Sequence, residues 1–120
     1  MSWSFSNDKP IFQQLVDIIT LKIISGEYPA GSKLDAVREL AVTAGVNPNT
    51  MQRALAEIEN TGLIFTKRGD GRYVTEDGNK ITAAKNAYVA ERVRLFIESV
   101  KALGLDDEEV LNAVNNELRR

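Results

Sequence analysis

Polar side chains near the middle of the chain carry its most informative chemistry. Asn49, Thr50, Gln52 and Arg53 follow Pro48, which suits the first turn of a helix because its missing N–H is not needed there. Asn and Gln can pair through two hydrogen bonds with adenine in the major groove of DNA, and Arg pairs with guanine or phosphate. Recognition helices present such residues at their N-terminal end. This stretch predicts either a DNA-reading helix or simply a solvated helix start.

The same segment supplies an apolar face that would hold these polar residues in place. We expect a helix over residues 48–60, with Asn47 at the N-cap, where small polar side chains accept backbone N–H groups. Apolar residues recur along it at helical spacing, at Met51, Ala54, Leu55 and Ile58. This face should point into a core, which leaves the polar first turn exposed.

Two further helices are expected before this one. Residues 10–25 carry an apolar stripe at helical spacing, and Gly26 should end that helix. Residues 36–43 predict a short second helix. Asp35 suits its N-cap, because a carboxylate is favoured at the positive end of the helix dipole. Gly45 then allows a tight turn, so the expected order is helix, helix, turn, helix.

A β-hairpin is expected directly after the third helix. Residues 63–67 and 72–75 are rich in β-branched and aromatic residues and flank a short loop of Gly and Asp, a pattern typical of two strands joined by a tight turn. Lys67, Arg68 and Gly69 suit phosphate or minor-groove contact, because long cationic side chains reach inward and Gly lets the backbone approach closely. The alternative is a solvated hairpin tip. This order of elements predicts a winged helix-turn-helix.

The C-terminal part predicts two helices with an apolar face that needs a partner. A polar linker precedes a helix over residues 80–103, and a last helix should begin with a capping box of Asp106 and Glu109. The first helix, another protein or a second copy could cover the apolar face, since two helices of this size cannot bury it. We expect a homodimer, whose symmetry would present two recognition helices to a palindromic site. The predicted dimer contacts are Tyr88, Val89, Val93, Phe96, Ile97, Val100, Leu111 and Val114.

The expected fold is therefore mostly α-helical with a small β-hairpin wing. An N-terminal winged helix-turn-helix domain would span residues 1–77, and a C-terminal two-helix dimerisation domain would span residues 78–120. The C-terminal domain has too few residues to enclose a typical metabolite cavity. A small-molecule effector is therefore doubtful, although a pocket at the dimer interface stays open as an alternative.

The composition excludes several classes of chemistry. The 120-residue chain contains no cysteine and no histidine, which removes thiol chemistry, the usual transition-metal sites and nucleophiles activated by histidine. The consecutive acidic residues 106–109 would not converge on a metal from one helix. Catalysis by Asp or Glu with Lys or Tyr would need a pocket for which the sequence shows no Gly-rich loop. We expect no cofactor, no metal and no enzymatic activity.

Charge and hydropathy bear on partners and location. The net charge is −2, so any DNA affinity must come from locally placed basic groups, and non-specific binding should be weak and strongly salt-dependent. The N-terminus has no basic segment followed by an apolar stretch, and no apolar run reaches membrane-spanning length. We expect a cytoplasmic protein without a membrane partner.

The ordered set of motifs resembles the GntR family of transcriptional regulators, and within it the short YtrA-like subfamily. The matching positions are residues 10–14, 26–31, 34, 37–41, 45–54, 62–64 and 67–74. The C-terminal helix pair is similar to the small dimerisation domain of that subfamily. The resemblance implies a sequence-specific DNA-binding regulator, expected to be a repressor that binds a double-stranded operator as a homodimer.

The resemblance also implies roles for individual residues. Arg38 would contact the DNA backbone, and Arg53 would reach a phosphate or brace the helix. Residues at the groove would be Asn47, Asn49, Thr50 and Gln52, and Arg68 and Gly69 would enter the minor groove from the wing tip. The chain departs from the family where Asp35 and Ala36 replace the common Pro-Ser pair, which removes a hydroxyl and adds a negative charge near the DNA backbone.

A protein-interaction function stays open as an alternative to DNA binding. A winged helix can serve as a protein-interaction module, with the exposed amides and the apolar C-terminal helices docking another protein. The basic wing tip argues against this alternative, which predicts no binding to DNA of operator length.

Overall fold

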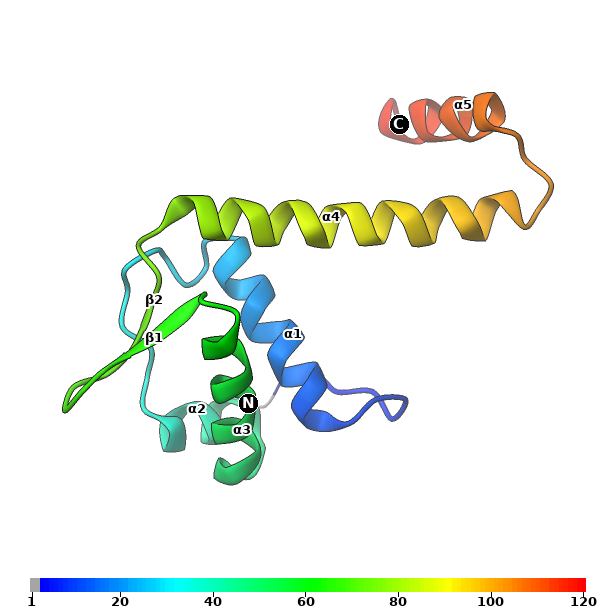
Figure 1. The fold of residues 1–120 in the computed structure, drawn as a ribbon. Coiled ribbons are helices and arrows are strands. Elements are labelled where there is room, and N and C mark those ends of the chain that lie inside the picture. The colour runs from blue at the N-terminus through cyan, green and yellow to red at the C-terminus, as the bar shows by residue number, and fades with distance from the viewer. Residues whose placement is uncertain (1–2) are drawn as a thin grey trace. The chain divides into compact units, whose positions relative to one another are not determined.

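A computed structural model describes residues 3–120, which form five helices and one β-hairpin (Figure 1). The elements in chain order are α1 (Ile11–Ile24), α2 (Val37–Ala44), α3 (Pro48–Asn60), β1 (Ile64–Lys67), β2 (Gly71–Val74), α4 (Gly78–Lys101) and α5 (Asp107–Leu118). The chain divides into two compact units, one ending at Ala84 and the other covering Lys85–Arg120. This boundary lies inside α4, and the domain boundary expected at residue 77 stays a prediction.

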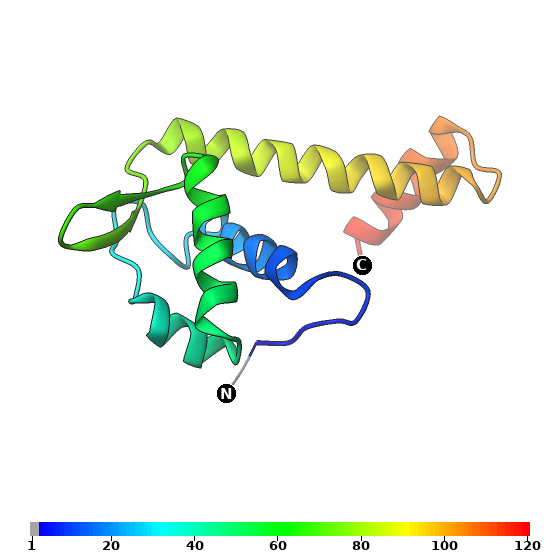
Figure 2. The same ribbon diagram turned by 60° about the horizontal axis from the view of Figure 1, so that its bottom comes forward.

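The N-terminal unit is built around an apolar core. In Figures 1 and 2 α3 lies against α1 and α2, and the hairpin projects on the same side as α2. The predicted inner face of α3 is confirmed, since Met51, Ala54, Leu55 and Ile58 are all buried. The other core residues are Leu15, Ile19, Ile23, Leu34, Leu40, Ala41, Ala44, Leu63, Ile64 and Val74.

Local signals set the start of α3. Pro48 is its first residue, and the side chain of Asn47 accepts a hydrogen bond of 2.8 Å from the backbone N–H of Asn49. Gly45 ends α2 with φ +78°, a left-handed conformation that glycine adopts without steric cost. The predicted cap, the first-turn proline and the glycine turn are thus confirmed.

The expected N-cap at Asp35 is wrong. The N-cap of α2 is Ala36, and no side chain caps this helix. A capping side chain must sit on the N-cap residue itself to reach the N–H groups of the first turn. Because the helix begins at Val37, the carboxylate of Asp35 lies one residue too early.

The hairpin has antiparallel strands in simple register. Its pairs are Ile64 with Val74, Phe65 with Tyr73, Thr66 with Arg72, and Lys67 with Gly71. Strand β1 begins one residue later than predicted, and β2 has the predicted length but lies one residue earlier in the chain. Lys33, in the segment before α2, forms an isolated bridge with Tyr73. The hairpin is therefore tied along β2 to the chain that leads into α2.

The C-terminal unit consists of the later part of α4 together with α5. The predicted capping box is confirmed: Asp106 accepts from the backbone N–H of Glu109 at 2.9 Å, and Glu109 accepts from that of Asp106 at 3.1 Å. Within residues 85–120 the only buried apolar side chain is that of Val110. No helix in the described part of the chain is long and apolar enough to cross a membrane.

Candidate nucleic-acid interface

The first turn of α3 presents its polar side chains outward. Asn49 and Gln52 are exposed, and Thr50 is half-buried. Asn47 is exposed as well, but its side-chain oxygen already caps the helix. Asn49 and Gln52 therefore have side chains available for bidentate pairing with a base edge.

Arg53 is engaged within the protein. Its guanidinium lies 3.8 Å from the centroid of the Phe12 ring on α1, within the range of a cation–π contact. This contact links α3 to α1 and favours the bracing role expected as one alternative for Arg53. A contact of Arg53 with phosphate stays a prediction.

The wing tip combines exposed cations with a glycine. Arg68 and Gly69 are exposed in the loop, and the Lys67 ammonium lies 4.2 Å from the centroid of the Tyr73 ring. Gly69 has φ +78°, and a Cβ atom added there would meet nothing within 4 Å. The loop thus needs glycine for its backbone conformation, and the space above Gly69 is open for close approach by a partner.

A carboxylate at the wing tip is paired on both of its oxygens. Asp70 accepts a hydrogen bond from Lys33 at 2.8 Å through Oδ1 and from the Tyr73 hydroxyl at 2.7 Å through Oδ2. The hydrogen bonds from Lys33 and Tyr73 hold the pKa of Asp70 below its usual value. The same interactions raise the pKa of Lys33 and of Tyr73.

A second carboxylate joins the base of the wing to α3. Glu59, on α3, accepts hydrogen bonds of 2.8 Å from the Thr66 hydroxyl and from Nε of Arg72. Burial acts to raise the pKa of Glu59, but the hydrogen bonds from Thr66 and Arg72 and the charge of Arg72 outweigh it, so this pKa is lowered. The wing is therefore held to α3 by a polar cluster as well as by its apolar side.

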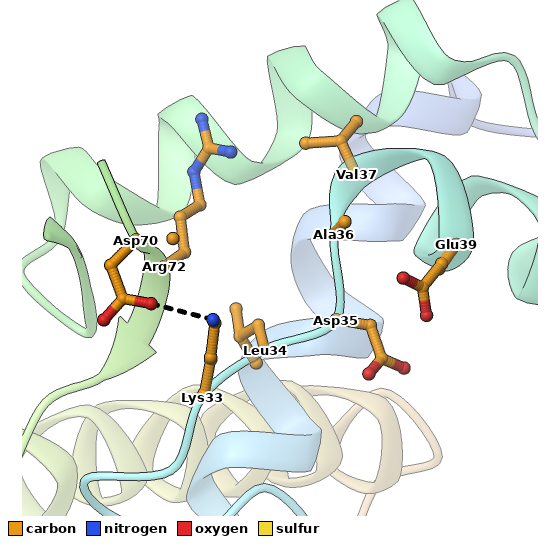
Figure 3. A pocket seen from close by; sticks show the side chains of 9 residues that line it. Lys33, Leu34, Asp35, Ala36, Val37, Glu39, Asp70 and Arg72 are labelled. Atoms are coloured by element: carbon orange, nitrogen blue, oxygen red, sulfur yellow. Dashed lines mark hydrogen bonds and ion pairs between the residues drawn. The ribbon is translucent and has the colours of Figure 1, made fainter. Parts of the chain in front are cut away.

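A hollow of about 480 Å³ lies between the wing and the start of α2 (Figure 3). Its lining comprises Lys33, Leu34, Asp35, Ala36, Val37, Glu39, Asp70, Gly71 and Arg72. Figure 3 shows Lys33 paired with Asp70, while the carboxylates of Asp35 and Glu39 stand apart from that pair. Neither Asp35 nor Glu39 has a hydrogen-bonded or ion-paired side-chain partner within residues 3–120. The negative charge expected at Asp35 is therefore uncompensated by any ion pair.

The predicted DNA-contacting residues come from three elements of the N-terminal unit. Arg38 is exposed on α2, the amides lie on the first turn of α3, and Lys67, Arg68 and Gly69 lie at the wing. Figures 1 and 2 show α2 and the wing on one side of this unit. Sequence reasoning missed Lys33, Glu59 and Asp70, whose pairings follow from the strand register and from contacts distant in sequence.

The predicted dimer contacts lie in the C-terminal unit and differ in exposure. Val89, Val93, Phe96 and Leu111 are 52%, 48%, 43% and 64% exposed. The half-buried members are Tyr88, Ile97, Val100 and Val114. The structure thus leaves a row of large apolar side chains uncovered along α4.

Comparisons with known proteins agree on one family. Residues 11–74 match the family described as bacterial regulatory proteins, gntR family. The chain is 36% identical to the uncharacterized HTH-type transcriptional regulator YhcF of Bacillus subtilis, over 95% of this chain and 94% of that protein. It is 35% identical to the HTH-type transcriptional repressor YtrA of the same organism, over 81% of this chain and 70% of that protein.

A solved structure extends this agreement to the fold. A GntR family transcriptional regulator from Listeria monocytogenes superposes with a TM-score of 0.88 and 42% sequence identity, over 93% of this chain and 98% of that one. The family and its relatives are transcription regulators rather than enzymes. The chain is accordingly a DNA-binding transcriptional regulator that belongs to the GntR family.

Proposed function

We propose that this regulator is a repressor that binds a palindromic operator as a homodimer. The observation that carries the proposal is the pairing of two features in one chain: a winged helix with an exposed polar recognition turn, and a helical unit with an uncovered apolar row. The first feature supplies DNA reading, and the second supplies the symmetry that a palindrome requires.

Base reading is assigned to the start of α3. Asn49 and Gln52 project from its first turns with free amide groups, and such amides pair bidentately with adenine. Arg38 on α2 is assigned to the DNA backbone. Arg68 and Gly69 are assigned to the minor groove, with Lys67 close behind them on β1. Phosphate contacts would position the protein, and the amides would supply sequence preference.

The dimer is assigned to the apolar row on α4. Val89, Val93 and Phe96 recur at intervals of four and three residues, so they share one face of the helix. A twofold axis through this row would bring the same residues from two copies together, as an isologous interface requires. Burial of these side chains would supply the apolar surface that a stable dimer needs.

Repression is assigned from similarity. The relative YtrA is named as a repressor, and a dimer that occupies an operator overlapping a promoter would block polymerase.

The experiment is fluorescence anisotropy with a labelled duplex from upstream of the protein's own operon, compared with a scrambled duplex at several salt concentrations. Tight binding to the upstream duplex alone, with two chains per duplex, is expected. Equal and weak binding to both duplexes would contradict the operator assignment and would favour a protein-interaction role.

Two variants separate the assigned roles. Gln52→Ala should relax base preference, with a loss of about 1–3 kcal/mol on the preferred duplex and little change on the scrambled one. Arg38→Ala should weaken binding to both duplexes and lower the salt slope by about 1. An equal loss on both duplexes for Gln52→Ala would contradict its role in base reading.

A further inference from the structure

Asp70 stands at a place where a negative charge should oppose DNA binding. It follows Arg68 and Gly69 directly at the wing tip. A carboxylate there would repel phosphate unless its charge were compensated. The structure compensates it, since Lys33 pairs with one oxygen and the Tyr73 hydroxyl with the other.

These contacts tie the tip of the wing to a segment far away in the sequence. Lys33 lies in the stretch before α2, and its neighbour Leu34 donates a backbone hydrogen bond of 2.9 Å to Arg72 on β2. The side chain of Lys33 crosses Gly71 so closely that a Cβ atom there would lie 3.0 Å from its Cε. The backbone pairing of Leu34 with Arg72 and the close passage over Gly71 thus hold the Lys33 side chain next to Asp70.

Tyr73, the second partner of Asp70, is itself fixed. Its ring stacks against that of Phe65, with centroids 5.9 Å apart, and carries Lys67 on a face at 4.2 Å. The backbone N–H of Asp70 also donates to the carbonyl of Lys67 at 2.9 Å. The Asp70 carboxylate therefore links Lys33 to Tyr73, and Tyr73 contacts Lys67, so these residues together support the loop that contains Arg68.

We propose that Asp70 is a positioning residue that holds Arg68 and Gly69 of the wing in place for the minor groove, with its own charge neutralised by Lys33. The proposal rests on the wing contact assigned above. Asp70 would then favour DNA binding, although the negative charge of its carboxylate alone would oppose it.

The exposure of the pair determines how the effect should appear. The side chains of Lys33 and Asp70 are 51% and 43% exposed, and such surface ion pairs contribute little to folding stability. Loss of the pair should therefore leave the thermal unfolding midpoint nearly unchanged. It should lower the fraction of wings in the binding geometry, which reduces affinity by the same factor, about threefold to tenfold.

Asp35 offers a matched control in the same hollow. It lines the hollow together with Asp70, but it has no hydrogen-bonded or ion-paired side-chain partner within residues 3–120. Asp35→Ala removes only a negative charge and should raise operator affinity. Asp70→Ala removes the same charge together with the contacts to Lys33 and Tyr73, and should lower operator affinity. The two substitutions are thus expected to act in opposite directions.

The test measures the affinity of the full chain for the upstream duplex by fluorescence anisotropy, with Asp70→Ala, Asp35→Ala, Arg68→Ala and the double variant of Arg68 and Asp70. Because Asp70 acts chiefly through Arg68, with Gly69 as the smaller contributor, Asp70→Ala should cause at most a small further loss in the Arg68→Ala background. Thermal unfolding of each variant is measured alongside.

Each contrary outcome has its own meaning. An Arg68→Ala protein that binds as tightly as the wild type would contradict the wing contact, and the positioning role with it. If Arg68→Ala weakens binding but Asp70→Ala strengthens it, as Asp35→Ala should, the positioning role alone is overturned. A full additional loss in the double variant, or a large drop in the unfolding midpoint for Asp70→Ala, would also overturn it.

Discussion

The two units of this chain differ in the burial of their apolar side chains. The N-terminal unit buries residues from α1, α2, α3 and both strands in one core. The C-terminal unit has one buried apolar side chain, that of Val110, and exposes several large ones along α4 and α5. The difference teaches that the first unit carries its own core, whereas the second has almost none, which is the observation behind the proposed dimer.

Chain length explains the contrast. Residues 85–120 are fewer than the roughly 40 below which a chain seldom folds on a core of its own. In the proposed dimer, a second copy of the same helices would double the apolar surface available for burial and would present two copies of α3 with twofold symmetry. Stability of the second unit should therefore depend on protein concentration, and stability of the first should not.

The largest expected effect follows from a charge placed on the exposed row of α4. Phe96→Asp should convert the proposed dimer into monomers, because burying a carboxylate in an apolar interface is strongly unfavourable. The loss should amount to about 2–4 kcal/mol per copy and is counted twice in a symmetric dimer. Sedimentation velocity over a range of concentrations measures the change, and operator affinity should fall with it.

Leu95 provides the control for that experiment. It is 51% exposed on the same helix, but it lies about 100° around the helix from Phe96 and so off the face that Val89, Val93 and Phe96 share. Leu95→Asp should leave the protein dimeric. If the Phe96→Asp protein stays dimeric, or if both variants dissociate equally, the assignment of the apolar row on α4 to the dimer interface is contradicted.

The next effect concerns the core of the first unit. Leu55 is 1% exposed, and Leu55→Ala should reduce the free energy of unfolding by about 2–5 kcal/mol. Leu111, 64% exposed on α5, allows the same chemical change in the other unit. Urea denaturation should show a loss for Leu55→Ala at every protein concentration, and a loss for Leu111→Ala that depends on concentration. If both variants lose the same unfolding free energy at every protein concentration, the second unit does not depend on a partner for its stability.

Periodicity and local capping were enough to predict most of the fold from sequence. The inner face of α3, the Asn47 cap and the hairpin all follow from residues near one another in the chain, where spacing alone determines which side faces the core. Asp35 shows the limit of this reasoning, because a cap depends on a helix boundary known only to within a residue or two. Thr20, buried on α1, was missed because a polar residue interrupts an apolar stripe.

The candidate site was less accessible to sequence reasoning. The first turn of α3 could be identified because base-reading side chains have a characteristic chemistry. The pairs of Glu59 with Arg72 and of Asp70 with Lys33 join residues 13 and 37 positions apart. Such pairs depend on the register of the hairpin and on how it packs, which composition and spacing do not determine.

A smaller effect is expected from the two helix caps. Asn47→Ala and Asp106→Ala should each destabilise their helix by about 1 kcal/mol. The loss for Asn47→Ala should appear in the unfolding of the first unit, and that for Asp106→Ala in the dimer equilibrium. Thermal unfolding at two protein concentrations separates these outcomes. Asn47→Ser keeps a capping oxygen and should retain stability, and a loss equal to that of Asn47→Ala would show that the cap is not responsible.

The smallest effect is a difference in acid sensitivity between the units. The pKa of Glu59 is lowered from its ordinary 4.5. The unfolded chain therefore takes up a proton first as the pH falls below this value, and the stabilisation present above it is lost as the pH drops through the folded pKa. Asp107 in the second unit also has a lowered pKa, through its pairing with Lys101. Its side chain is 83% exposed, however, against 30% for Glu59.

Solvent screening makes the Asp107 pair nearly neutral for stability, whereas the partly buried pair of Glu59 should contribute up to about 1 kcal/mol. Glu59→Gln should therefore flatten the decline of stability below pH 4.5, and Asp107→Asn should leave that decline as in the wild type. Urea denaturation at a series of pH values checks both. If Asp107→Asn flattens the decline as much as Glu59→Gln does, solvent exposure does not weaken the Asp107 pair. The two units would then differ in the burial of their apolar side chains but not in the strength of these ion pairs.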